Sequence, residues 1–229
     1  MSFCERTVAL IGQENFDRLA SKNIIVFGCG GVGGYVIEML ARTGIGSLCL
    51  VDFDAVAESN INRQIIALYD TVGQYKTECF AKRIEKINKS CKVQTFNEKL
   101  SAENIDKFDL KQFDYVVDCI DDVKAKVELI KYCEKNKIKL ISSMGAGNRF
   151  DMPNFVVGDI FDTKNDGLAK AVRTRLKKEG IKKAKVAWTA SLPNKVDDDS
   201  SVVGSIAYYP AMCGITIASY VINELIKQK

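Results

Sequence analysis

The chain has 229 residues, with 33 lysines and arginines, 29 aspartates and glutamates and no histidine. This length suits one large α/β domain, and a formal net charge of +4 does not by itself require a nucleic-acid partner. Without histidine, no Ser-His-Asp or Cys-His catalytic arrangement and no histidine-ligated metal can form within the chain. The eight cysteines include no CxxC pair, so we expect reduced core thiols in a cytoplasmic protein. No apolar run is long enough for stable membrane insertion.

A short helix with a turn at Gly12 is expected within residues 8–22. The strongest local pattern follows, because the apolar run Ile24–Phe27 predicts a strand that leads through a glycine-rich turn into a helix ending near Arg42. Glycine lets backbone amides approach a phosphate at a helix N-terminus. The turn therefore predicts a nucleotide site, although a close-packed strand-to-helix turn is the simpler alternative for glycines alone. The candidate phosphate-binding glycines are Gly28, Gly30, Gly31 and Gly33.

The next strand, Ser47–Val51, ends at Asp52, whose carboxylate could accept hydrogen bonds from a ribose. Residues 53–76 form a long connection, and loops of that length often carry function. Further strands and helices then alternate. The expected helices cover residues 75–89, 102–108 and 123–137, and the expected strands cover residues 92–96, 115–118 and 139–142.

This alternation predicts a Rossmann-like, doubly wound, mostly parallel sheet with helices on both faces. Ligands of such sheets bind at the carboxyl ends of the strands, where the glycine turn, Asp52 and Asp121 would lie. We expect a single domain over residues 1–229, with a nucleotide-binding core over 1–163 and an α+β extension over 164–229.

The extension begins with a basic segment, residues 164–185, which holds nine lysines and arginines against two acids. Such a run fits either a solvated helix or a surface for a polyanionic partner. A strand is expected over residues 186–189 and a mobile loop over 191–205. The apolar stretch 211–226 predicts a closing helix that packs in the core or in a dimer interface rather than in a membrane.

Several short motifs follow the glycine turn in a fixed order. Together with GCGGVG at 28–33 and the pair Arg6-Thr7, they closely resemble the ubiquitin-activating-enzyme-like superfamily of ATP-dependent adenylating enzymes. The resemblance covers about two thirds of the chain. It implies that a substrate carboxylate attacks the α-phosphorus of ATP while pyrophosphate leaves. The motifs are VDFD at 51–54, SNINRQ at 59–64, VGQYK at 72–76 and VDCIDD at 117–122.

The resemblance also implies roles for charged residues. Arg63 and Lys76 would contact the phosphates, and Asp121 would bind Mg²⁺ through a hard carboxylate oxygen. Taken singly, Arg63 and Lys76 could be surface charges and Asp121 a helix N-cap. For the adjacent Asp122, the N-cap role is the better interpretation.

Four other residues complete the expected site. Asp52 corresponds to the acid that binds ribose, and Asp54 and Asn60 correspond to neighbours that shape the site. Arg6 corresponds to an arginine that, in homodimeric relatives, reaches into the nucleotide site of the partner. The resemblance therefore implies a homodimer.

Three segments, 142–163, 168–183 and 204–226, resemble the tRNA threonylcarbamoyladenosine dehydratase branch. The implied reaction activates the threonyl carboxylate of a modified adenosine beside the anticodon and closes a ring with net loss of water. No protein nucleophile is needed. Cys213 is the best candidate for one, but a core role is the favoured interpretation. The residues that could neutralise tRNA phosphates are Lys170, Arg173, Arg175, Lys177, Lys178, Lys182, Lys183 and Lys185.

Three alternatives stay open at this point. The first is an adenylating enzyme for the C-terminal glycine of a ubiquitin-like sulfur carrier protein or peptide, although such enzymes usually carry zinc-binding CxxC pairs that are absent here. The second is a nicotinamide-dependent oxidoreductase, which gives Arg63, Lys76 and Asp121 no role. The third is a nucleotide-sensing scaffold. A sulfur-transfer partner protein is a further possibility that the sequence leaves undecided.

Overall fold

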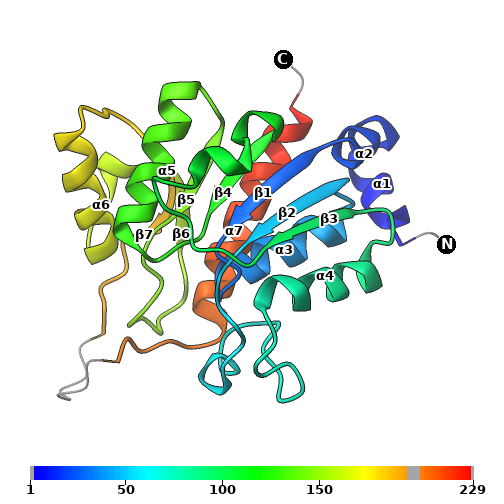
Figure 1. Cartoon of the computed structure of the whole chain (residues 1–229), viewed down its shortest axis with the longest axis horizontal. Coiled ribbons are helices and arrows are strands. Elements are labelled where there is room, and N and C mark those ends of the chain that lie inside the picture. Colours follow the sequence, from blue (N-terminus) through cyan, green and yellow to red (C-terminus); the bar gives the residue numbers. More distant parts are fainter. Residues whose placement is uncertain (1–2, 195–201, 228–229) are drawn as a thin grey trace.

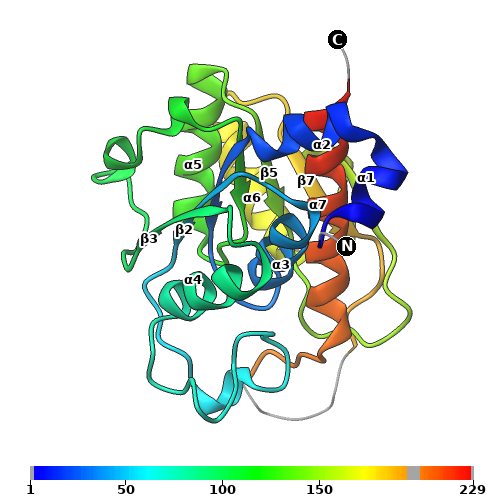
Figure 2. The same ribbon diagram turned by 90° about the vertical axis from the view of Figure 1, so that its right-hand side faces the viewer.

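The computed structural model describes residues 3–194 and 202–227, which form a sheet covered by helices on both faces (Figures 1 and 2). The strands are β1 Asn23–Phe27, β2 Ser47–Val51, β3 Lys92–Phe96, β4 Tyr115–Asp118, β5 Leu140–Ser143, β6 Phe155–Asp159 and β7 Lys185–Thr189. The α-helices are α1 Glu5–Ile11, α2 Gln13–Ala20, α3 Gly33–Thr43, α4 Lys76–Ile87, α5 Val123–Asn136, α6 Gly167–Lys178 and α7 Tyr208–Ile226. Short 3₁₀ helices are η1 Glu58–Asn60, η2 Ile105–Phe108, η3 Leu110–Gln112 and η4 Ile160–Asp162.

The seven strands follow the order β3-β2-β1-β4-β5-β7-β6, which is the predicted doubly wound arrangement. β1 lies near the middle and pairs in parallel with β2 and β4. Its side chains point alternately to the two faces: Ile24 and Val26 join one core cluster, and Ile25 and Phe27 join another. A strand buried on both faces needs a continuous apolar run, which is why this segment is recognisable from sequence.

Each face has its own helical layer. Residues of α2, α3, α4 and α7 pack into the cluster that contains Val26, whereas α5 packs with η2 and η3 over Phe27. A third cluster joins α5 and α6 to β7. The closing helix α7 and the basic helix α6 therefore lie on opposite faces of the sheet (Figure 1).

Several element boundaries differ from the predictions. The N-terminal helix is two helices, α1 and α2, which meet at Gly12 with a φ of 82°, so the turn at that residue is confirmed. The expected helix over 102–108 is a 3₁₀ turn. The closing helix starts at Tyr208, because Pro210 fits the first turn, where a missing N–H costs no helical hydrogen bond. Part of the loop expected over 191–205 lies outside the described residues.

One strand was not predicted. β6 pairs antiparallel with β7 at the edge of an otherwise parallel sheet, and η4 and α6 lie between the two strands along the chain. In the described part of the chain, no helix combines the length and apolar character needed to cross a bilayer.

Candidate active site

A cavity of about 940 Å³ opens at the carboxyl ends of the parallel strands. Nine of the eleven residues that the sequence analysis assigned to the site line it, whereas Gly33 and Arg6 do not. Residues that are far apart in the sequence are therefore brought to one place. The nine are Gly28, Gly30, Gly31, Asp52, Asp54, Asn60, Arg63, Lys76 and Asp121.

The glycines of the turn have two different roles. Gly28 has a φ of 87°, and a Cβ on it would lie 2.7 Å from the Cys119 carbonyl oxygen. A Cβ on Gly33 would lie 1.8 Å from the carbonyl oxygen of Gly28, so both positions are required by packing. Gly30 and Gly31 have no backbone this close and face the cavity. Gly33 packs behind the turn and does not line the cavity, and its role in phosphate binding stays a prediction.

Asp52 connects the end of β2 to the glycine turn. Its Oδ2 accepts the Cys29 N–H at 2.6 Å and its Oδ1 accepts the Asp54 N–H at 2.8 Å. Burial raises the pKa of Asp52, and the two backbone hydrogen bonds oppose this shift. Each oxygen keeps a second lone pair. The carboxylate can therefore hold the glycine turn through these backbone hydrogen bonds and still accept a hydrogen bond from a ligand in the cavity.

The cationic side of the cavity comes from the long connection after β2. Lys76 Nζ lies 2.7 Å from Asp54 Oδ2. Arg63 donates from Nη1 to the Ser59 carbonyl oxygen at 2.8 Å. Asn60 accepts the Ala57 N–H at 3.1 Å and so closes the turn at η1. The length of this connection is explained by the two cations that it places on the cavity wall.

Asp121 follows β4 and is exposed in the cavity, with no hydrogen bond or ion pair to any described residue. Its neighbour Asp122 caps α5, where its carboxylate accepts the Ala125 N–H at 2.9 Å and thereby acquires a lowered pKa. The N-cap interpretation of Asp122 is confirmed. The carboxylate of Asp121 remains free to bind a ligand through its oxygens.

A buried network that the sequence analysis missed supports this carboxylate. Asp118 Oδ2 accepts Lys126 Nζ at 2.9 Å and the Ser142 hydroxyl at 2.6 Å. Its other oxygen accepts the Ile120 N–H at 3.0 Å, which shapes the turn that ends at Asp121. The available signal was a lysine inside the apolar face of α5, eight residues after an aspartate.

Comparisons with known proteins identify the family to which this chain belongs. The chain matches the ThiF family over residues 4–229. It belongs to the ThiF family.

Individual relatives are similar over most of their length. A tRNA threonylcarbamoyladenosine dehydratase of Bacillus subtilis is 37% identical over 97% of this chain and 94% of the relative. The enzyme of that name from Escherichia coli is 42% identical over 76% of this chain, and the match spans 65% of the relative. The crystal structure of the E. coli dehydratase in complex with ATP superposes with a TM-score of 0.91 at 34% identity, covering 97% of this chain and 93% of that one.

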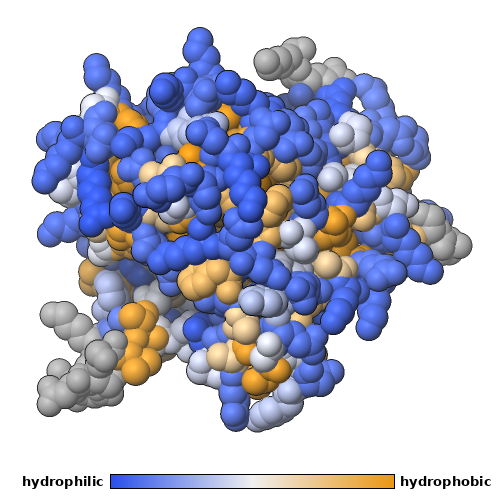
Figure 3. Space-filling model, viewed as in Figure 1, coloured by the Kyte–Doolittle hydropathy of each residue, from blue (hydrophilic) through white to orange (hydrophobic). Residues whose placement is uncertain are grey.

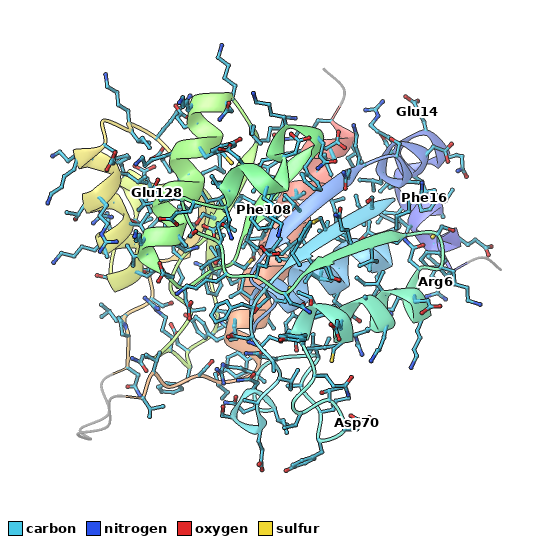
Figure 4. All side chains as sticks on the ribbon, in the orientation of Figure 1. Arg6, Glu14, Phe16, Asp70, Phe108 and Glu128 are labelled. Atoms are coloured by element: carbon cyan, nitrogen blue, oxygen red, sulfur yellow. The ribbon has the colours of Figure 1, made fainter. Side chains whose placement is uncertain are left out.

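Arg6 of this ThiF-family chain stands apart from the cavity. It is exposed on α1, at the edge of the molecule (Figure 4). Within one chain it therefore does not meet the other predicted residues. A role in the site would require a second chain, as the resemblance implied.

Another part of the cavity wall was not predicted from the sequence. It comes from the loop after β5, from the start of α6 and from the chain before α7, and it includes the buried residue Arg149. Arg149 was not singled out, because an arginine in a loop gives no sign of burial in sequence. The lining residues of this wall are Met144, Gly145, Ala146, Gly147, Asn148, Arg149, Asp166, Gly167, Leu168, Pro193, Val203 and Ser205.

Cys213 lies in the core of the ThiF-family fold. It is fully buried within α7, and burial raises the pKa of its thiol well above the ordinary value. A thiolate nucleophile is excluded by this environment, so the core interpretation is confirmed.

The basic segment forms α6 and the chain that follows it, and the surface over α5 and α6 is strongly hydrophilic (Figure 3). Arg173 differs from the other basic residues, because it is half-buried and donates to the carbonyl oxygen of Thr163 at 2.9 Å. It holds the loop before α6 and is not available for phosphates. The other residues expected to neutralise tRNA phosphates are exposed: Lys170, Arg175, Lys177, Lys178, Lys182, Lys183 and Lys185.

Proposed function

We propose that this ThiF-family chain is an ATP-dependent tRNA threonylcarbamoyladenosine dehydratase. It adenylates the threonyl carboxylate of the modified adenosine next to the anticodon and lets the activated carbonyl close a ring with loss of water. The observation that carries the proposal is the convergence of Arg63, Lys76 and Asp121 on one cavity beside the glycine turn. Dehydratases of that name that are similar over nearly the whole chain support it.

The cavity residues suit this chemistry. Attack by a carboxylate on the α-phosphorus develops negative charge on the phosphate oxygens and the departing pyrophosphate, and fixed cations stabilise it. Arg63 supplies a planar fork of donors and Lys76 a compact charge. Asp52 orients the glycine turn through the Cys29 N–H and would hold the ribose with its remaining lone pairs.

The residues present also fit Mg²⁺. No cluster of three or more potential ligands exists among the described residues, but magnesium in nucleotide sites commonly uses one or two carboxylates together with substrate phosphates. Asp121 is a free carboxylate in the right cavity, so we assign it to hold the ion. When bound, Mg²⁺ would supply charge neutralisation at the phosphates.

The exposed cations of α6 support a tRNA substrate, since a row of lysines can neutralise phosphates without reading the sequence. We further propose a cytoplasmic homodimer in which Arg6 completes the site of the partner chain. The alternative of a ubiquitin-like sulfur carrier is disfavoured, because the chain lacks CxxC pairs. Burial also raises the pKa of the Cys119 thiol, which lines the cavity, to about 12, and that of the core thiol Cys29 well above the ordinary value. The proposed reaction itself transfers no sulfur atom, and a sulfur-transfer partner protein stays a separate prediction.

The direct test incubates threonylcarbamoyl-modified tRNA with the protein, ATP and MgCl₂ and measures nucleoside masses after digestion. Loss of one water from the modified adenosine, dependent on ATP, is the expected result. Asp121→Asn is the matched control, since it changes one exposed carboxylate and should bind nucleotide without completing the reaction. Unchanged modified tRNA with a protein that binds ATP would reject the proposal and favour a protein or peptide carboxylate.

A further inference from the structure

Arg149 is a buried cation that lines the cavity from the loop after β5. It is 6% exposed, and its guanidinium joins three segments of chain. Nε donates to the Ser191 carbonyl oxygen at 3.0 Å, Nη1 donates to those of Gly145 and Gly147 at 3.1 and 3.2 Å, and Nη2 donates to that of Asn165 at 2.8 Å. All four of these acceptors are neutral carbonyl groups.

The positive charge of Arg149 thus has no anionic partner among the described residues. Across residues 3–194 and 202–227, no carboxylate comes within ion-pair distance of the guanidinium. Asp166 touches the same loop, but its oxygens accept the Gly145 N–H and the Ala169 N–H. A buried charge is costly unless it is paired, and an arginine keeps its charge at all accessible pH values.

One of the five N–H donors of Arg149 has no acceptor among the described residues. A guanidinium has five N–H groups, and the four carbonyl oxygens occupy one on Nε, two on Nη1 and one on Nη2. One Nη2 N–H therefore has no partner among the described residues, on a side chain that lines the cavity. A charge-assisted hydrogen bond to an anionic ligand would use this donor and compensate the charge.

The other lining cations are already accounted for. Arg63 and Lys76 come from the connection after β2, near the glycine turn, where the phosphates are expected. Lys99 lies 3.8 Å from Asp122 and over the ring of Phe53. Arg149 is the lining cation that remains for a second anion in the cavity.

We propose that Arg149 binds the carboxylate of the threonyl group and holds it toward the α-phosphate. The proposal rests on the proposed function, in which this carboxylate is the nucleophile and the single anionic group on the modified base. It names Arg149 as the residue that distinguishes an acid substrate from a neutral one. Arg149 donates a hydrogen bond and transfers no proton.

The test compares two short RNA hairpins of the anticodon arm, one with the threonyl carboxylate and one with the corresponding neutral amide. Their dissociation constants are measured with the wild-type protein and with Arg149→Gln. The wild type is expected to prefer the carboxylate by roughly 10- to 100-fold, the range of a hydrogen bond to a charged group. Arg149→Gln should reduce this preference to less than about 3-fold while leaving the affinity for ATP unchanged.

Arg173→Gln provides a matched control, because Arg173 also donates to backbone carbonyl oxygens but does not line the cavity. It should lower Tm and keep the preference for the carboxylate. If Arg149→Gln does not fold, Arg149→Lys is used instead. It keeps the positive charge but loses the planar set of donors, so its preference for the carboxylate should be smaller than that of the wild type.

A preference in the Arg149 variants that equals that of the wild type would overturn the inference, and Arg149 would then serve only to hold three loops together. That result differs from failure of the proposed function. In the latter case the wild-type protein would not dehydrate modified tRNA at all, whatever residue 149 is.

Discussion

The ammonium of Lys76 lies 2.7 Å from a carboxylate oxygen of Asp54, and the lysine side chain is 5% exposed against 47% for the aspartate. The cation is thus neutralised by a partner that can reach solvent. In the proposed reaction, Asp54 can keep Lys76 in position until phosphate oxygens share its charge.

Lys76→Ala should lower the rate of dehydration by at least about 100-fold, the usual effect of removing a preorganised donor at the reacting group. Asp54→Asn should keep ATP binding but lower the free energy of unfolding by about 1–2 kcal/mol, because it leaves a buried ammonium unpaired. Turnover assays and urea unfolding check the two effects separately. Wild-type turnover in Lys76→Ala would remove this lysine from the site.

The proposed role of Arg6 across a dimer interface can be tested by complementation. A mixture of Arg6→Ala and Lys76→Ala chains should recover about a quarter of wild-type activity, because half of the dimers are mixed and one of their two sites is complete. Each variant alone should be inactive. Mixed dimers that are confirmed by mass and show no activity would contradict a role in trans.

Cys213 should be dispensable for catalysis. Cys213→Ala is expected to keep turnover near the wild-type level and to lower stability by about 1 kcal/mol through the small cavity it leaves. Iodoacetamide at neutral pH should leave Cys213 unmodified, since burial raises its pKa and blocks access. The half-buried Cys91, whose pKa is raised to about 11, serves as the comparison thiol. Loss of turnover in a folded Cys213→Ala protein would revive a covalent mechanism.

The cations of α6 should act through tRNA phosphates. Replacing Lys177 and Lys178 by alanine should weaken tRNA binding and reduce the slope of log K against log salt by about 0.7–0.9 for each phosphate that the protein no longer neutralises. The control replaces Lys86 and Lys89, exposed residues at the end of α4 and just after it, on the other side of the molecule (Figure 1). Equal effects of the two pairs would indicate only a general loss of charge.

The ion pairs of Glu38 connect α3 to α4, and we expect them to make the stability of the protein depend on pH. Glu38 is 3% exposed and accepts hydrogen bonds from Arg83 and Arg42, each at 2.7 Å. Burial alone would raise the pKa of Glu38, but the hydrogen bonds and charges of the two arginines outweigh it and lower the pKa below its usual 4.5.

A carboxyl whose pKa is lowered in the folded state stabilises the protein above its unfolded pKa, and this stabilisation is lost as pH falls below 4.5. Glu38→Gln should therefore lower the free energy of unfolding by about 1–3 kcal/mol at pH 7, less than a fully buried pair because both arginines reach solvent. The difference should shrink at acid pH. Denaturant unfolding at several pH values measures it, and a constant difference would contradict the ion-pair explanation.

Much of the fold was predictable, because its parallel strands are buried on both faces and read as apolar runs separated by helical patterns. β1 and β4 are examples. β6 was not predicted, because it is an edge strand whose side chains are only half-buried. Its pairing with β7 depends on residues about thirty positions away, which no local pattern encodes.

The sequence by itself determined nine of the residues that line the cavity, through the glycine turn, the strand ends and the resemblance to an adenylating superfamily. Only the tertiary structure decided their individual roles. It divided the glycines into packing and cavity positions and showed that Arg173 binds a loop instead of facing solvent. It also buried Arg149 at the cavity with no carboxylate partner among the described residues. The physical reason is that burial and hydrogen-bond partners are set by contacts between segments distant in sequence. An arginine bound to backbone carbonyl groups therefore looks the same in sequence as one that faces solvent.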